Sequence, residues 1–224
     1  IWKRLRHCNI LKLMGTTSDF GPSAALVAPW IVNGTLTSFL NHNNETLTLL
    51  ERLFLVSTLS AFTEDGHTTL NPVVHGDLTG NNVLISGDKK AYLADFGLSG
   101  TLHASTGMTY LAKMSHCPGA VRWTAPELLS EDESASAVTT QSDIYSLGSI
   151  MLQVLTGNVP WRHLTKEGTI AVRVYEGTIH PRPDDERISD QHWNFMVSCW
   201  SRTPNDRPSA KEALQFVVSQ LSLL

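Results

Sequence analysis

The fold of this chain is decided by one stretch, VVHGDLTGNNVLI at residues 73–85. Apolar residues open and close it, and they read as buried segments on either side of a polar loop. Within the loop, Asp77 and Asn82 are five residues apart. The pattern therefore places a carboxylate and an amide on the same short loop.

A hairpin is predicted directly after this loop. The apolar runs 83–85 and 91–94 are separated by Ser-Gly-Asp at residues 86–88, which is typical of a tight turn. Because the two strands of a hairpin lie side by side, the segments before and after it meet in space. Asp95 is therefore expected near Asp77.

Apolar periodicity predicts the remaining elements. Short apolar runs broken by Gly and Pro predict two strands, over residues 11–14 and 24–27. Apolar residues at helical spacing predict three helices, over residues 46–61, 144–155 and 209–221. Gly157 is expected to end the second of these helices and Ser209 to cap the third. The second half of the chain is thus mainly helical.

The composition excludes several classes of protein. The chain has 224 residues, of which 42% are hydrophobic, which suits a compact domain rather than a disordered chain. Its longest nearly unbroken apolar run, residues 24–32, is far shorter than the roughly 20 residues that cross a bilayer, so no membrane partner is expected. A formal charge of −4 gives no broad basic surface, so nucleic acid is not expected as a partner.

The three cysteines, Cys8, Cys117 and Cys199, are odd in number and far apart. This pattern favours buried free thiols in a reducing compartment, so an intracellular, cytoplasmic location is expected. Ile1 leads into a charged run at residues 3–6 rather than a signal peptide, and the chain reads as a piece of a longer protein.

Three motifs occur in a distinctive order. Asp95-Phe96-Gly97 follows Asp77 by 18 residues, and RWTAPE at residues 122–127 ends 32 residues after Asp95. This order and spacing resembles the catalytic loop, the metal-binding D-F-G and the A-P-E of protein kinases. Three further segments extend the resemblance, to the tyrosine-kinase-like type: HCNIL at 7–11, SDIYSLG at 142–148 and CW at 199–200 with Pro204, Arg207 and Pro208.

The resemblance implies an α+β, protein-kinase-like fold with a mainly helical C-lobe and a truncated, β-rich N-lobe. Residues 1–224 would form one kinase-like domain, with an N-lobe remnant over 1–28, a hinge over 29–34 and the C-lobe over 35–224. It also implies ATP and Mg²⁺ as cofactors, and ATP and a protein as substrates. The oligomeric state is not readable from the sequence.

The resemblance also assigns catalytic roles. Asp77 would accept the proton of the substrate hydroxyl. Asn82 and Asp95 would be the magnesium ligands, and both supply the oxygen donors that this cation prefers.

For the nucleotide, the resemblance places Ala28 at the back of the adenine pocket. The carbonyl of Pro29 and the N–H of Ile31 would face the base, and the missing N–H of Pro29 is tolerable there because that position offers only its carbonyl. Leu84 would form the floor of the pocket, although an ordinary strand residue fits that position equally well.

Five residues are structural in this interpretation. His75 and Phe96 would stack between the lobes, and Asp143 would cap the backbone of the catalytic loop. Glu127 and Arg207 would form a buried ion pair.

The sequence also departs from the kinase pattern. It contains no G-x-G-x-x-G loop and no V-A-I-K strand, so the chain alone is expected to be inactive. Gly76 replaces the usual Arg, and Thr79 and Ala120 stand where Ser/Thr kinases place a Lys and a hydroxyl that contact the catalytic Asp. Three readings follow: an ATP-dependent protein kinase, a pseudokinase serving as a binding module, and a small-molecule kinase resembling aminoglycoside and choline phosphotransferases.

Overall fold

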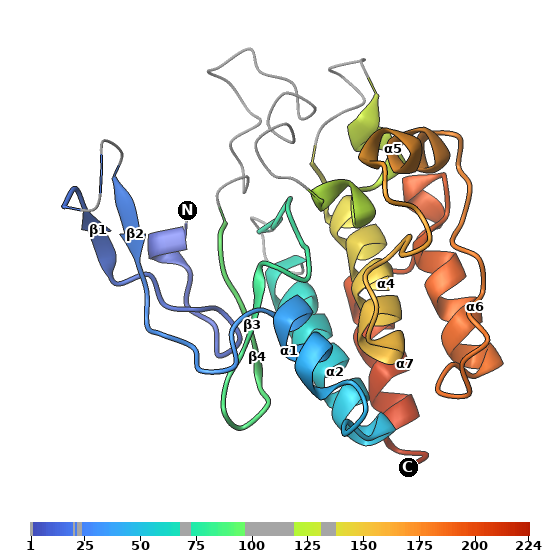
Figure 1. Cartoon of the computed structure of the whole chain (residues 1–224), viewed down its shortest axis with the longest axis horizontal. Coiled ribbons are helices and arrows are strands. Elements are labelled where there is room, and N and C mark those ends of the chain that lie inside the picture. The colour runs from blue at the N-terminus through green and yellow to red at the C-terminus, as the bar shows by residue number, and fades with distance from the viewer. Residues whose placement is uncertain (1, 20, 22–23, 68–72, 97–118, 131–137) are drawn as a thin grey trace.

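Two small antiparallel sheets lie beside a helical body (Figure 1). The computed structural model describes residues 2–19, 21, 24–67, 73–96, 119–130 and 138–224. In the first sheet, β1 (Gly15–Thr17) pairs with β2 (Ala25–Val27), and in the second, β3 (Val83–Ile85) pairs with β4 (Ala91–Leu93). The described chain also has short 3₁₀ turns, at Trp2–Arg4, Ala120–Arg122, Pro126–Leu129 and Pro204–Asp206.

The helical body is built around α4. Its helices are α1 (Leu36–Asn43), α2 (Leu49–His67), α4 (Thr140–Thr156), α5 (Glu167–Tyr175), α6 (Asp190–Cys199) and α7 (Ala210–Leu221). Helix α2 packs against α4 and α7, and α4 packs against α6. Every residue of α4 from Ser142 to Thr156 is buried, so this helix is the axis of the core.

One predicted strand is wrong. Residues 11–14 do not form a strand of the first sheet, which begins at Gly15. Instead, Leu93 N donates to Asn9 O at 2.8 Å and Leu11 N donates to Leu93 O at 2.8 Å, so the chain at 9–11 runs along β4. Leu11 is buried beside the second sheet, whereas Met14 is 65% exposed and its N–H donates to Val27 O of β2 at 2.8 Å. Apolarity alone does not identify the pairing partner of each residue.

Side-chain caps explain where the helices begin. Helix α2 starts later than predicted because Thr48 and Glu51 form a reciprocal cap: Glu51 N donates to Thr48 Oγ1 at 3.3 Å and Thr48 N to Glu51 Oε2 at 2.9 Å. Helix α4 ends at Gly157 in the left-handed conformation, and Ser209 caps α7, both as predicted. The short helices α1, α5 and α6 were not predicted.

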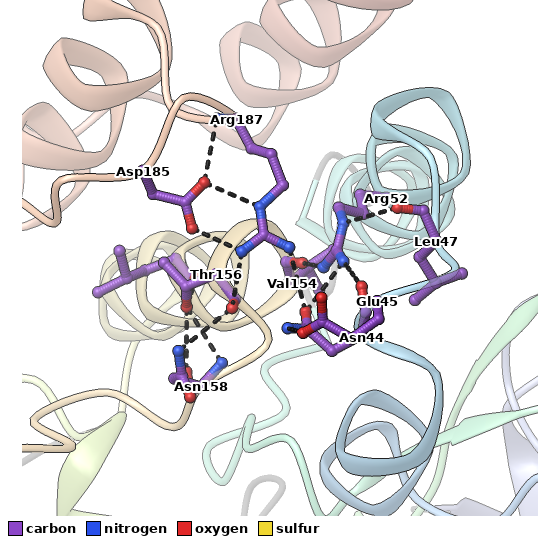
Figure 2. Close-up of polar contacts among 10 residues, drawn as sticks. Asn44, Glu45, Leu47, Arg52, Val154, Thr156, Asn158, Asp185 and Arg187 are labelled. Carbon is purple, nitrogen blue, oxygen red and sulfur yellow. Dashed lines mark hydrogen bonds and ion pairs between the residues drawn. The ribbon is translucent and has the colours of Figure 1, made fainter.

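A fully buried arginine joins three parts of the helical body (Figure 2). Arg52 of α2 donates to Val154 O of α4 at 2.5 Å, to Leu47 O at 3.3 Å, and to Asn44 Oδ1 at 2.9 Å. Arg187 also reaches Asn44 Oδ1, at 3.2 Å. These carbonyl and amide oxygens accept hydrogen bonds from the Arg52 guanidinium and so offset the free-energy cost of burying its charge.

The structure corrects one expectation about the thiols. Cys199 is buried as expected, whereas Cys8 is exposed, and Cys117 lies outside the described residues. Within the part of the chain that the structure describes, no helix is both long and apolar enough to span a bilayer.

Candidate active site

The loop before β3 brings Asp77 and Asn82 together. Asn82 Nδ2 donates to Asp77 Oδ2 at 2.9 Å and to Asp77 O at 2.8 Å. Asn82 N donates to Thr79 O at 3.1 Å, which closes the turn between the two residues. The sequence spacing of five therefore corresponds to direct contact between the amide and the carboxylate.

The hairpin returns Asp95 to the same loop. Ala94 N donates to Asn82 O at 2.9 Å, so the residue before Asp95 is hydrogen-bonded to Asn82 itself. Asp95 is exposed and has a φ of 58°, in the left-handed region that non-glycine residues seldom adopt. Such backbone conformations occur preferentially at functional sites. Gly97 lies outside the described residues.

The environment of Asp77 raises its pKa. Burial is the main cause, and the negative charges of Asp95 and Asp143 act in the same direction. The hydrogen bond from Asn82 opposes the shift. A carboxylate whose pKa is raised is a better proton acceptor, because its conjugate acid is less acidic.

Asp143, at the start of α4, holds the backbone of this loop. Its Oδ2 accepts from His75 N at 2.8 Å and its Oδ1 accepts from Gly76 N at 2.9 Å. Gly76 has a φ of 80°. A glycine adopts this conformation without the strain that a side chain would add, so the departure from the usual Arg removes backbone strain here.

His75 joins the loop to β4. Its Nδ1 accepts from Asp77 N at 3.2 Å, and its Nε2 lies 3.1 Å from Ala94 O. Since a carbonyl oxygen only accepts, the proton of a neutral imidazole is assigned to Nε2. The His75 ring packs on Phe96 with centroids 4.6 Å apart, and Trp2 lies 6.2 Å from Phe96. The structure thus brings the two residues of the expected stack into contact and places Trp2, which the resemblance also implies as a continuation of this stack, beside Phe96.

The segment expected to contact adenine lies along β3. Ile85 N donates to Gly34 O at 2.9 Å, and Thr35 forms a bridge with Leu84. Gly34 N donates to Ile31 O at 3.1 Å, so Ile31 is one turn away from the bridge to Leu84. Ala28, half-buried, and Pro29, exposed, follow β2 directly, and no hydrogen bond described here joins them to the loop at 75–82.

Glu127 and Arg207 form a bidentate ion pair between distant segments. Arg207 Nη1 lies 2.6 Å from Glu127 Oε1, and Nη2 lies 2.7 Å from Oε2. The Arg207 side chain is 0% exposed and that of Glu127 is 14% exposed. This pair ties the 3₁₀ turn at Pro126–Leu129 to the segment before α7.

Gln153 is a positioning residue that sequence reasoning missed. Its Oε1 accepts from Trp123 Nε1 at 3.1 Å, and its Nε2 donates to Thr37 Oγ1 at 3.1 Å. Thr37 N in turn donates to Gly80 O, in the loop at 75–82, at 3.1 Å. A Cβ on Gly80 would lie 2.3 Å from Gln153 Oε1, so a side chain there would have to displace the Gln153 amide from its bonds. A polar residue inside the apolar run 150–155 was the available signal.

The site has no larger set of metal-binding side chains. Among the described residues, no group of three or more His, Cys, Asp or Glu could hold a metal ion. Asp95, Asp77 and the amide oxygen of Asn82 are oxygen donors of the type that Mg²⁺ takes together with phosphate oxygens and water. No described hydrogen bond uses Asn82 Oδ1, because Nδ2 makes the contacts with Asp77.

Comparisons with known proteins point to one family. A family profile described as protein tyrosine and serine/threonine kinase matches residues 1–217. Serine/threonine-protein kinase TNNI3K of Rattus norvegicus is 28% identical over 219 residues, covering 97% of this chain and 25% of that protein. Ephrin type-A receptor 5 of Homo sapiens is 30% identical over 214 residues, covering 94% of this chain and 19% of that protein. The chain thus spans a quarter or less of these relatives.

Proposed function

The chain belongs to the protein tyrosine and serine/threonine kinase family, and we propose that its loop at 75–82, together with Asp95, serves the transfer of the γ-phosphate of ATP to a hydroxyl of a protein substrate. One observation carries the proposal: Asn82 Nδ2 lies 2.9 Å from Asp77 Oδ2, while the backbone of Asn82 is bonded to the residue before Asp95. These bonds place the residue before Asp95 beside the contact of Asp77 with Asn82, which supports a shared site for the three residues.

Each residue has a defined role in this proposal. Asp77 accepts the proton of the attacking hydroxyl, and its raised pKa favours that transfer. Asn82 and Asp95 would hold Mg²⁺, which when bound neutralises charge on the phosphate oxygens. Asp143 fixes the loop, so that Asp77 keeps its orientation at little entropic cost.

The adenine of ATP is assigned to the hinge at 29–34, between the N-lobe remnant at 1–28 and the C-lobe at 35–224. Pro29 O and Ile31 N would bond the base, with Ala28 behind it and Leu84 beneath it. The backbone bonds between Gly34 and Ile85 support this placement, because they hold the hinge against β3.

A pseudokinase that serves as a binding module is the second candidate, and Thr79 favours it. Thr79 is 5% exposed, and its hydroxyl accepts from Asn81 N at 3.3 Å within the loop. It therefore stands in the place of the Lys that contacts the transferring phosphate in Ser/Thr kinases without supplying a positive charge. Ala120 likewise supplies no hydroxyl.

Nucleotide binding tests the magnesium ligands. We expect the 224-residue chain to bind a fluorescent ATP analogue weakly, and more tightly with Mg²⁺ than with EDTA. Asp95→Asn should remove the effect of Mg²⁺, whereas Asp88→Asn, in the exposed turn of the hairpin, should leave it unchanged. Binding that does not respond to Mg²⁺, or that Asp95→Asn leaves intact, would contradict the assignment.

Transfer of radiolabelled γ-phosphate to a generic protein substrate separates the two candidates. For the chain alone we expect negligible turnover, because the sequence contains no glycine-rich loop or V-A-I-K lysine. Mg²⁺-dependent turnover that Asp77→Asn abolishes would establish the kinase and refute the expected inactivity. Mg²⁺·ATP binding without turnover, even when the missing elements are supplied in a longer chain, would establish the binding module.

A further inference from the structure

A cavity of about 410 Å³ lies at the C-terminal end of α4, and it shares no residue with the proposed active site. Leu152 of α4, Val159 and Pro181 give it an apolar surface, and the loops at 158–163 and 180–183 form its walls. Its volume lies within the range of small-molecule sites, which are also mainly apolar with a few polar groups.

The wall of this cavity is held in place from behind. Arg122 donates to Pro160 O at 2.8 Å, to Trp161 O at 3.0 Å and to Leu164 O at 3.0 Å. Trp161 has a φ of 58°, a conformation that a bulky residue keeps only when its surroundings enforce it. The cavity is therefore preformed, which lowers the entropic cost of binding.

The charge around the cavity is positive. Arg162, His163 and Arg182 line it, and none of the described residues that line it is acidic. Arg182 is paired with the exposed carboxylate of Asp190 at 2.6 Å, whereas no described ion pair involves Arg162. Arg162 is exposed, so its guanidinium is available to an anion at the mouth of the cavity.

Two polar atoms of the cavity wall lack hydrogen bonds. Trp161 Nε1 and His180 Nε2 are buried and have no partner among the described residues, and their side chains are 4% and 2% exposed. The indole nitrogen can only donate, and a neutral imidazole donates through Nε2 in one tautomer. Both atoms are covered by neighbouring groups, so the exposed guanidinium of Arg162 is the group that an anion in the cavity would meet.

We propose that this cavity binds a small aromatic carboxylate. The aromatic ring would pack against Leu152, Val159 and the indole of Trp161. The carboxylate would face the exposed guanidinium of Arg162 at the mouth of the cavity. This site is independent of ATP and of the proposed transfer reaction.

The test is calorimetric titration of the 224-residue chain with 1-naphthoate and with the uncharged 1-naphthamide. We expect saturable binding of the acid at least tenfold tighter than that of the amide. Arg162→Gln should remove most of this preference, while Arg173→Gln, an exposed arginine of α5 outside the cavity, should keep it. Val159→Trp should fill the cavity and abolish binding of both compounds.

Three results would overturn the proposal: no saturable binding of the acid, equal affinity for acid and amide, or an affinity that neither Arg162→Gln nor Val159→Trp alters. Binding of an acidic peptide that ends in Phe, in the absence of naphthoate binding, would also overturn it in favour of a protein partner. Because Arg162 is exposed, Arg162→Gln should leave the circular dichroism spectrum unchanged.

Discussion

Removing Arg207 tests the ion pair that joins two distant parts of the helical body. Arg207→Met replaces the guanidinium with an apolar side chain of similar length. It removes both bonds to Glu127 and those to Gln141 O at 2.9 Å and Ser201 O at 2.9 Å. A carboxylate that is 14% exposed is left without its cation.

The expected loss of stability follows from the burial of this ion pair. Removing one partner of a buried pair typically costs about 3–5 kcal/mol, because the other charge stays buried. We expect Arg207→Met to lower the free energy of unfolding by about that amount. The double variant Arg207→Met, Glu127→Leu leaves no orphan charge and should cost less than the sum of the two single changes, by about 1–3 kcal/mol.

Urea unfolding followed by circular dichroism measures these differences. The exposed pair of Arg182 with Asp190, whose side chains are 43% and 84% exposed, supplies the control: Arg182→Gln should change stability by less than about 1 kcal/mol. A loss below about 1 kcal/mol for Arg207→Met with an unchanged m-value would refute the reasoning. So would full additivity in the double variant.

Three further changes probe other buried groups, each measured by urea unfolding. Burial lowers the pKa of His180 to about 3 from 6.5, so the unfolded chain takes up the proton first as pH falls, and stability is lost progressively below about pH 6.5 down to about pH 3. His180 should account for about 2 kcal/mol of the stability difference between pH 8 and pH 5, and an equal pH dependence in His180→Phe would contradict this. Gly80→Ala should lower the free energy of unfolding by about 1–3 kcal/mol, because its Cβ would meet Gln153 Oε1 at 2.3 Å. Gly168→Ala on α5 is the control: its Cβ would have no atom within 4 Å, so this change should be neutral or stabilising. Equal effects of the two changes would disprove the clash. Asp143→Asn should lower the free energy of unfolding by about 2–3 kcal/mol, because the NH₂ group of the new amide would face one of the two backbone N–H donors, His75 N or Gly76 N, and that hydrogen bond would be lost. An unchanged urea midpoint would argue against the role of Asp143 in holding this loop.

Local patterns predicted the elements whose signals are local. The hairpin of β3 and β4, the left-handed glycine that ends α4 and the Ser209 cap of α7 depend on neighbouring residues alone. The pairing of residues 9–11 with β4 depends on a contact across about 80 residues, and no local pattern specifies it. Helix α1, of 8 residues, is too short for its apolar period to stand out.

The site divides in the same way. Motif spacing anticipated the contact of Asp77 with Asn82, and the family resemblance anticipated the pair of Glu127 with Arg207. The buried position of Gln153 had a sequence signal, but its bonds did not, because its two partners, Trp123 and Thr37, come from distant segments that meet it only in the folded chain. The left-handed backbone of Asp95 also has no sequence signal, since aspartate is common at ordinary positions.

Helix α4 fixes the distances between the segments that are hydrogen-bonded to it. Asp143 accepts hydrogen bonds from the loop at 75–82, Ser146 Oγ donates to Trp123 O at 2.8 Å, and Gln153 is bonded to both Trp123 and Thr37. One residue inserted between Asp143 and Gln153 would advance everything after it by about 1.5 Å and rotate it by about 100°. The side chains after the insertion, such as Gln153, would then no longer face their hydrogen-bond partners. The length of the helix between Asp143 and Gln153 is therefore constrained by these bonds, and insertions are better tolerated in the loops that follow it.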